Sequence, residues 1–305
     1  MKKVDHGSKN QQHQLGPFVT WVVELQPHKQ TLLLTSRRQR KDLAPLPVAS
    51  ADIDPNAAVR GIRHHWTRFW GPRRIGWWIG VLFVIGSALF AIGGAKGAWP
   101  EENFLRWVDP EDLGWIFFVG SLFFTGAGYL QWLEAINGDV ADAGKAGTFR
   151  RRWRYRGWRL QNLGYVGATI QLVGMLFFNL NTADAMISGL GWVGEDVIVW
   201  TPNMLGSICF LAASHAAIME VSHRYWSWQF RSLSWWITAI NMIGSIFFMI
   251  SAVASFVEPR EVLLAEWVAN FGTFAGALCF LVAGYLLIPE QFELQKESKG
   301  SVSIN

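Results

Sequence analysis

Each of six long apolar stretches in this chain contains a glycine followed four residues later by a phenylalanine. Serine comes directly after the glycine in four of the six. A repeat of this kind constrains the architecture before any single residue is considered, because each copy belongs in an equivalent structural unit. The pairs are Gly86 and Phe90, Gly120 and Phe124, Gly174 and Phe178, Gly206 and Phe210, Gly244 and Phe248, and Gly276 and Phe280.

The apolar stretches are long enough to cross a membrane as helices. A hydrocarbon core of roughly 30 Å needs about 20 apolar residues in a helix. The chain has 51% apolar and only 16% charged residues. We therefore predict an all-α membrane protein with six transmembrane helices. The stretches lie at about 75–95, 113–135, 160–181, 199–221, 235–257 and 267–288.

Basic residues predict the orientation of these helices. Of the 27 lysines and arginines, all but Lys96, Arg106 and Arg260 lie before the first span, in the connections 136–159 and 222–234, or in the C-terminal tail. Lysine and arginine stay on the cytoplasmic side during insertion, so both termini are expected there. The basic clusters beside the spans indicate contact with anionic lipid headgroups rather than nucleic acid.

The spans align as three tandem helical hairpins, at about 71–137, 158–222 and 229–290. With the second helices aligned on their glycines, Glu134, Glu220 and Glu290 share one position, fourteen residues further on. Parallel copies of one unit predict a pseudo-threefold axis along the membrane normal. Residues 1–70 then form a basic cytoplasmic arm, and residues 291–305 a cytoplasmic tail.

The repeated glycines predict close helix packing, because glycine lets a neighbouring backbone approach. The three glutamates fall about 21 Å from these glycines at a rise of about 1.5 Å per residue. Arg73 and Arg231 occupy about the same depth on the first helices. We therefore predict three contacts at the cytoplasmic rim that hold the hairpins in register: Glu134 with Arg73, Glu290 with Arg231, and Glu220 with Arg159 or Gln161. A coupled proton or ion site is the alternative interpretation.

Amide side chains inside the spans are the other candidates for a functional role. Gln171 and Asn241 share one position of the repeat, and Asn203 and Asn270 lie in other spans. They either form hydrogen bonds between helices or line a polar pathway.

The arm is predicted to contain a β-hairpin, with strands at 19–25 and 31–35 around a turn at 26–29. Residues 44–56, with three prolines, are predicted to be a linker. Residues 60–74 combine aromatic and basic residues, as expected for a segment that approaches the membrane interface.

No sequence motif indicates an enzyme, a cofactor or a metal. The chain lacks a phosphate-binding loop, a dinucleotide fingerprint, an HExxH pair and a nucleophile elbow. Cys209 and Cys279 both lie in apolar runs, so disulfides are not expected. We expect a protein without enzymatic activity.

The segments FVIGSALF (Phe83 to Phe90) and FFVGSLFF (Phe117 to Phe124) resemble the YrhK-like bacterial membrane domain. That domain is a two-helix unit with an F-x-x-G-S-x-x-F core. Met175 and Ala277 stand where its serine is expected. The resemblance covers about residues 75–290 and implies a multi-pass protein of the bacterial inner membrane, without assigning a reaction.

Two functions remain open from the sequence. The first is a scaffold or accessory membrane protein whose arm binds lipid or a protein partner. The second is a small-molecule or cation transporter, or a channel, with a pathway along the pseudo-threefold axis. The position of the amides distinguishes them, because a pathway needs these side chains in a water-accessible axial cavity.

Overall fold

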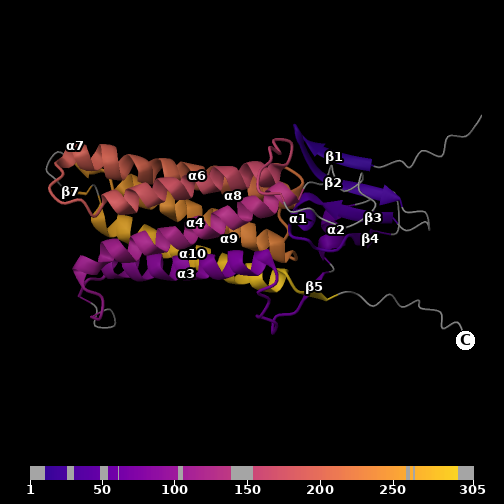
Figure 1. The fold of residues 1–305 in the computed structure, drawn as a ribbon, viewed down its shortest axis with the longest axis horizontal. Helices are drawn as coiled ribbons and strands as arrows, with labels where there is room; N and C mark the ends of the chain where they lie inside the picture. Colours follow the sequence, from indigo (N-terminus) through magenta and orange to yellow (C-terminus); the bar gives the residue numbers. More distant parts are fainter. Residues whose placement is uncertain are drawn as a thin grey trace, which may run out of the picture.

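The structure is a computed structural model that describes residues 11–25, 31–48, 54–60, 62–101, 106–138, 154–258, 262–263 and 265–294. Six helices in it are long and apolar enough to cross a membrane. The protein is a mostly helical, polytopic membrane protein with a small sheet at one end (Figure 1). The helices are α3 (Ile75–Ala98), α4 (Leu113–Asn137), α6 (Leu163–Asp184), α8 (Thr201–Ser222), α9 (Leu233–Ala254) and α10 (Glu266–Glu290).

The six helices form a closed ring in the order α3, α4, α6, α8, α9, α10 and back to α3. The glycines lie where consecutive helices come closest. A Cβ added at Gly86 would be 2.9 Å from the carbonyl oxygen of Gly120, and the glycines of α6 and α8, and of α9 and α10, meet similarly at 3.1 Å. The ring closes at Gly80, where a Cβ would lie 3.0 Å from the carbonyl oxygen of Gly284 on α10.

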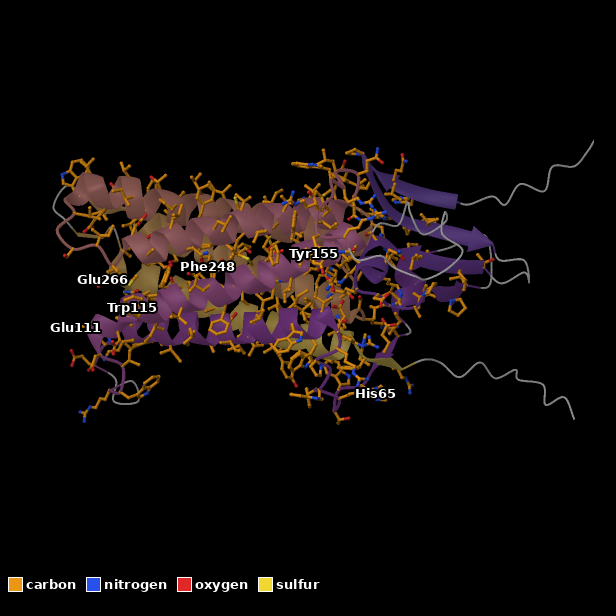
Figure 2. All side chains as sticks on the ribbon, viewed as in Figure 1. His65, Glu111, Trp115, Tyr155, Phe248 and Glu266 are labelled. Atoms are coloured by element: carbon orange, nitrogen blue, oxygen red, sulfur yellow. The ribbon has the colours of Figure 1, made fainter. Side chains whose placement is uncertain are left out.

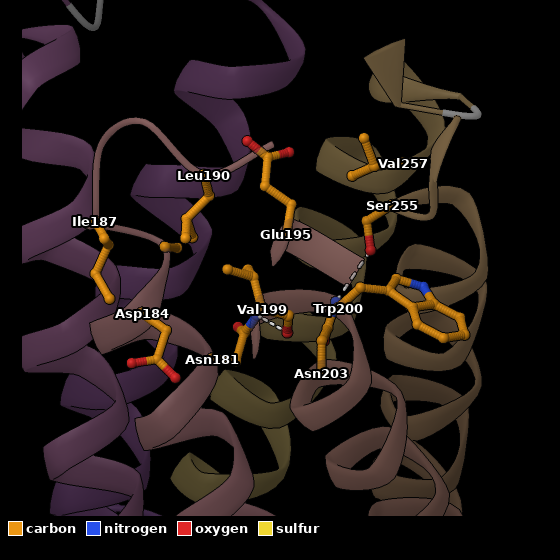
Figure 3. A pocket seen from close by; sticks show the side chains of 11 residues that line it. Asn181, Asp184, Ile187, Leu190, Glu195, Val199, Trp200, Asn203, Ser255 and Val257 are labelled. Carbon is orange, nitrogen blue, oxygen red and sulfur yellow. Dashed lines mark hydrogen bonds between the residues drawn. The ribbon is translucent and has the colours of Figure 1, made fainter. Parts of the chain in front are cut away.

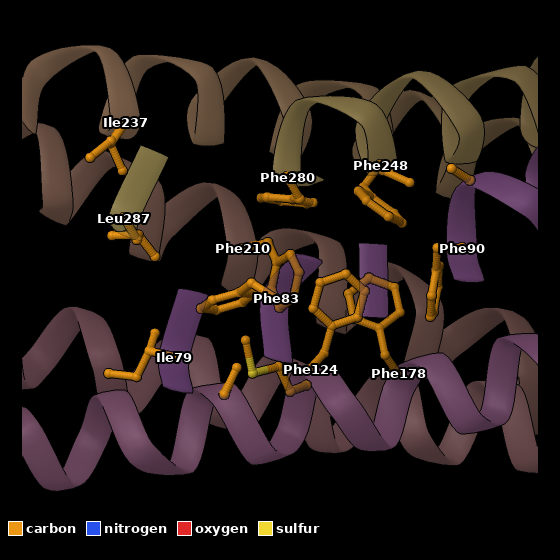
Figure 4. Packing of buried hydrophobic residues seen from close by; sticks show 14 residues of the cluster. Ile79, Phe83, Phe90, Phe124, Phe178, Phe210, Ile237, Phe248, Phe280 and Leu287 are labelled. Carbon is orange, nitrogen blue, oxygen red and sulfur yellow. The ribbon is translucent and has the colours of Figure 1, made fainter. Parts of the chain in front are cut away.

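The interior of the ring is filled by aromatic side chains. The six phenylalanines of the repeated pairs come from six helices and join one buried cluster (Figure 4). Each is only 4–5% exposed. Neighbouring rings have centroids 4.9–6.4 Å apart, mostly in edge-to-face contact, an arrangement that aromatic pairs prefer.

A four-stranded antiparallel sheet lies at one end of the ring, called here the sheet end. Its strands are β1 (Gln11–Leu15), β2 (Phe18–Leu25), β3 (Thr31–Thr35) and β4 (Leu46–Val48), in that order. The predicted hairpin is confirmed, because β2 pairs with β3; its turn lies outside the described residues. The linker prediction is wrong at 46–48, where β4 forms the sheet edge, a position that tolerates Pro47.

The chain segments before α3 and after α10 meet at the sheet end. After β3 come α1 (Ser36–Arg40), α2 (Pro55–Arg60) and β5 (Arg63–His64), and β5 pairs with β8 (Glu293–Leu294). The segment predicted to approach the interface contains the end of α2, β5 and turns, and Trp66, Phe69 and Trp70 are exposed. His65 and Tyr155 lie at this end, Glu111 and Glu266 at the opposite, distal end, and Phe248 between them (Figure 2).

The elements that connect the helices at the distal end are short in the described part of the chain. The helix α7 (Trp192–Gly194) and the π-helix η3 (Glu195–Trp200) lead directly into α8. The 3-10 helix η2 (Pro110–Asp112) precedes α4, and β6 (Val257–Glu258) pairs with β7 (Val262–Leu263).

Candidate functional site

Helix α1 and the residue that follows it, Lys41, carry four cations into the junction between the sheet and the helical ring. The Thr35 hydroxyl accepts a hydrogen bond from the backbone N–H of Arg38, which caps the start of the helix. Asp42 follows with a φ of 55°, a left-handed conformation that aspartate tolerates. A helix this short is unstable alone, so its stability depends on contacts with the ring.

Arg40 joins two membrane helices. Its Nη1 lies 3.1 Å from Oε2 of Glu134 on α4, and its Nη2 lies 2.9 Å from Oε2 of Glu220 on α8. Ser36 also donates to Glu220, at 3.1 Å. One guanidinium therefore fixes α1 to α4 and α8 together.

Glu290, on the last turn of α10, collects a second set of donors. Arg37 binds its two carboxylate oxygens in a bidentate pair at 2.9 and 3.0 Å. Lys41 lies 3.1 Å away, and Ser234 of α9 donates at 2.6 Å. Such charge-assisted, bidentate hydrogen bonds are among the strongest in proteins.

Arg38 extends the cluster beyond the membrane helices. It forms a bidentate pair with Glu293 of β8 at 2.7 and 2.6 Å, and also donates to the carbonyl oxygen of Ala44. The sheet, α1 and the C-terminal segment are therefore tied together. The charge cluster, as named here, comprises Arg37, Arg38, Arg40, Lys41, Glu134, Glu220, Glu290 and Glu293.

The charge cluster is almost completely removed from solvent. Its cations are 4–7% exposed, and Glu134, Glu220 and Glu290 are 1–2% exposed. Burial alone would lower the pKa of Arg40, but the carboxylates of Glu220 and Glu134 outweigh it and raise that pKa. For Lys41 burial prevails over Glu290, and its pKa is lowered. Four cations face four carboxylates, so the cluster is neutral and each charge depends on its partners.

Small residues make room for these ion pairs. A Cβ added at Gly164 would lie 2.5 Å from Oε1 of Glu220 and 3.0 Å from Nε of Arg40, and Gly138 packs directly on the backbone of Arg40. A side chain at either position would displace Arg40.

The predicted partners of the three glutamates are wrong. Arg73 and Arg231 are exposed, and within the described part of the chain no salt bridge joins them to Glu134 or Glu290. Glu220 pairs with Arg40 in place of Arg159 or Gln161. The physical reason is position: α1 crosses the end of the ring, where one cation reaches carboxylates on two helices away from water.

The intramembrane amides lie against helices. Asn203 donates to Ser255 at 3.0 Å, and Asn270 packs on Gly97 of α3, where an added Cβ would lie 2.5 Å from its Oδ1. Gln171 and Asn241 are half-buried. The buried phenylalanines occupy the centre of the ring.

A small cavity of about 30 Å³ lies beside the charge cluster, between α1 and the ends of α8, α9 and α10. His223 lines it and is 5% exposed, and its Nδ1 has no hydrogen-bond partner among the residues that the structure describes. Burial lowers the pKa of His223 to about 4, with a smaller contribution from His13 and opposition from Glu220. The imidazole is therefore neutral at pH 7.

No family model, curated protein or solved structure matches this chain. The resemblance to the YrhK-like domain therefore stays a prediction.

The role of the cations at residues 37–41 was not predicted from the sequence. Their signal was present: SRRQRK, residues 36–41, follows a strand directly and carries four positive charges. Three glutamates at one predicted depth require a similar number of cations, and this run supplies them.

Proposed function

We propose that this protein is a non-enzymatic scaffold of the bacterial inner membrane. In this proposal the helical ring holds the N-terminal sheet in a set orientation at the cytoplasmic face. The observation that carries it is the charge cluster, which joins α1 to three membrane helices and to β8 through buried ion pairs. A partner that contacts the sheet would find it in one position relative to the membrane.

Two surfaces suit the proposed partners. Strand β1 forms an edge of the sheet, where a protein partner can add a strand. The segments that lead into α3, α6 and α9 each expose a tryptophan, Trp70, Trp158 or Trp228, at 74%, 84% and 64%. Arginines accompany them, and this mixture favours anionic phospholipid headgroups at a cytoplasmic interface. The distribution of basic residues along the chain supports the same orientation.

Transport along the axis is supported less well. Six phenylalanine rings lie in mutual contact at the centre of the ring, and a solute on that path would have to displace them. Gln171, Asn241 and Asn270 line neither the cavity beside the charge cluster nor a second cavity at the distal end, between α6 and η3. An axial pathway would need such polar groups facing water.

The orientation of the sheet can be measured by pulsed electron–electron resonance. Spin labels are placed at exposed positions on the sheet and on helix α4 of the ring, Gln14→Cys and Tyr129→Cys, in a chain with Cys209 and Cys279 replaced by serine. We expect one narrow distance distribution in nanodiscs. A broad distribution for the otherwise unchanged chain would contradict a preset orientation.

A flux measurement tests the alternative. The full chain is reconstituted in liposomes of phosphatidylethanolamine and phosphatidylglycerol, and potassium, proton and diamine fluxes are compared with those of empty liposomes. We expect no difference. A flux that Asn241→Leu abolishes, while the protein stays folded, would establish the transport function and overturn the scaffold.

A further inference from the structure

A second site lies at the distal end, far from the charge cluster. A cavity of about 240 Å³ opens between the end of α6, the π-helix η3 and the segment after α9. It is large enough for a ligand of several non-hydrogen atoms, because one water occupies about 30 Å³ in the liquid. Figure 3 shows Asp184 and Glu195 lying apart in the lining of this cavity.

Several donors in the lining of this cavity are already used within the protein. The amide nitrogen of Asn181 donates to the carbonyl oxygen of Val199 at 2.9 Å, and that of Asn203 to Ser255 at 3.0 Å. The indole N–H of Trp200 donates to the carbonyl oxygen of Ala252. The carboxylates of Asp184 and Glu195, which also line the cavity, are acceptors for a ligand.

No cation among the described residues balances the two carboxylates. The lining contains no lysine, arginine or histidine, and no salt bridge in the described part of the chain involves Asp184 or Glu195. The cavity therefore favours a ligand that carries positive charge and donates hydrogen bonds.

The π-helix brings part of the lining together. Its hydrogen bonds run from residue i to i+5 around a wider turn than in an α-helix, a geometry found mostly as single turns and frequently at functional sites. Glu195, Val199 and Trp200 lie four and five residues apart on η3, and all three line the cavity. Thr201 stabilises this turn by donating to the carbonyl oxygen of Asp196 at 2.7 Å.

The shape of the lining distinguishes an organic cation from a metal ion. Calcium needs six to eight oxygen ligands that converge at about 2.3–2.6 Å, whereas these two carboxylates lie apart (Figure 3). No group of three metal-binding side chains occurs among the described residues. The lining also contains the apolar side chains of Ile187, Leu190 and Val199, which suit a hydrocarbon chain.

We propose that the distal cavity binds a short aliphatic diamine, with one ammonium group at Asp184 and the other at Glu195. Asn181 and Asn203 offer amide oxygens to the same ammonium groups. This site is independent of the scaffold function proposed for the sheet end, and its test uses different residues.

The test is isothermal titration calorimetry of the full chain in nanodiscs with 1,4-diaminobutane and, separately, with butylamine. Losing one of two charge-assisted contacts weakens binding by about tenfold or more. We expect the diamine to bind at least tenfold more tightly than the monoamine. Asp184→Asn and Glu195→Gln should each reduce diamine affinity to about that of butylamine, with little effect on butylamine itself.

Glu111→Gln is the matched control, because Glu111 is an exposed acid at the same end and does not line the cavity. It should leave diamine affinity unchanged within about twofold, and melting curves should show that all variants are folded. Equal affinity for the two amines, an equal loss in the control, or no binding of 1,4-diaminobutane would overturn the proposal. Stronger binding of calcium than of the diamine would also overturn it.

Discussion

Replacing Glu290 with glutamine should release α1 from the helical ring. The substitution keeps the shape of the side chain but removes the negative charge that Arg37 and Lys41 share at 2.9–3.1 Å. Breaking a buried ion pair on one side costs about 3–5 kcal/mol, because the remaining charge stays buried without compensation. At about 1.4 kcal/mol per factor of ten, the population of molecules in which α1 has left the ring should rise roughly 150- to 4,000-fold. We call this the open state of α1.

Hydrogen exchange followed by mass spectrometry measures this opening directly, since the backbone amides of α1 exchange when the helix leaves the ring. Glu290→Gln should reduce their protection by at least a hundredfold. Glu266→Gln, an exposed acid at the other end of α10, is the control and should leave α1 protected. Adding Arg37→Gln to Glu290→Gln should cost less than Arg37→Gln alone, because the two residues are coupled. Protection that falls by less than tenfold, or equally in the control, would refute the reasoning.

Two further predictions concern packing and pH. Gly86→Ala should destabilise the ring by about 1–3 kcal/mol in thermal unfolding, because the carbonyl oxygen of Gly120 lies 2.9 Å from the added Cβ. Gly126→Ala is the control and should be neutral in the same assay, because the nearest atom to its added Cβ, on Leu82, lies 3.6 Å away. An equal effect of both would argue against backbone contact at the repeated glycines. The unfolded chain binds a proton at His223 near pH 6.5 and the folded chain near pH 4, so stability should fall by up to about 3 kcal/mol as pH drops through this window. In the variant His223→Asn, asparagine tolerates the left-handed backbone at this position and does not titrate, so this part of the pH dependence of stability should disappear. If stability depends on pH in the variant as in the original chain, another group is responsible.

The charge cluster shows how far sequence reasoning reached into the site. Glu134, Glu220 and Glu290 were identified from their repeated position, and the structure brings all three to α1. Their partners were not identified, because Arg40 lies 94 and 180 residues from Glu134 and Glu220, and Arg37 lies 253 from Glu290. A cation in the sequence carries no sign of which anion it meets, and Arg73 and Arg231 were equally available near the same depth.

The sequence by itself determined the six spanning helices and the strand pair β2–β3. Lipid leaves the backbone no partner outside its own helix, so length and apolarity are sufficient to predict a span, and β-branched runs around a turn predict a hairpin. Only the tertiary structure decided that α1 occupies the end of the ring, that six phenylalanines meet at its centre, and that an acceptor-lined cavity lies at the distal end. These features depend on which distant groups exclude water from one another, and that follows from three-dimensional packing, not from local pattern.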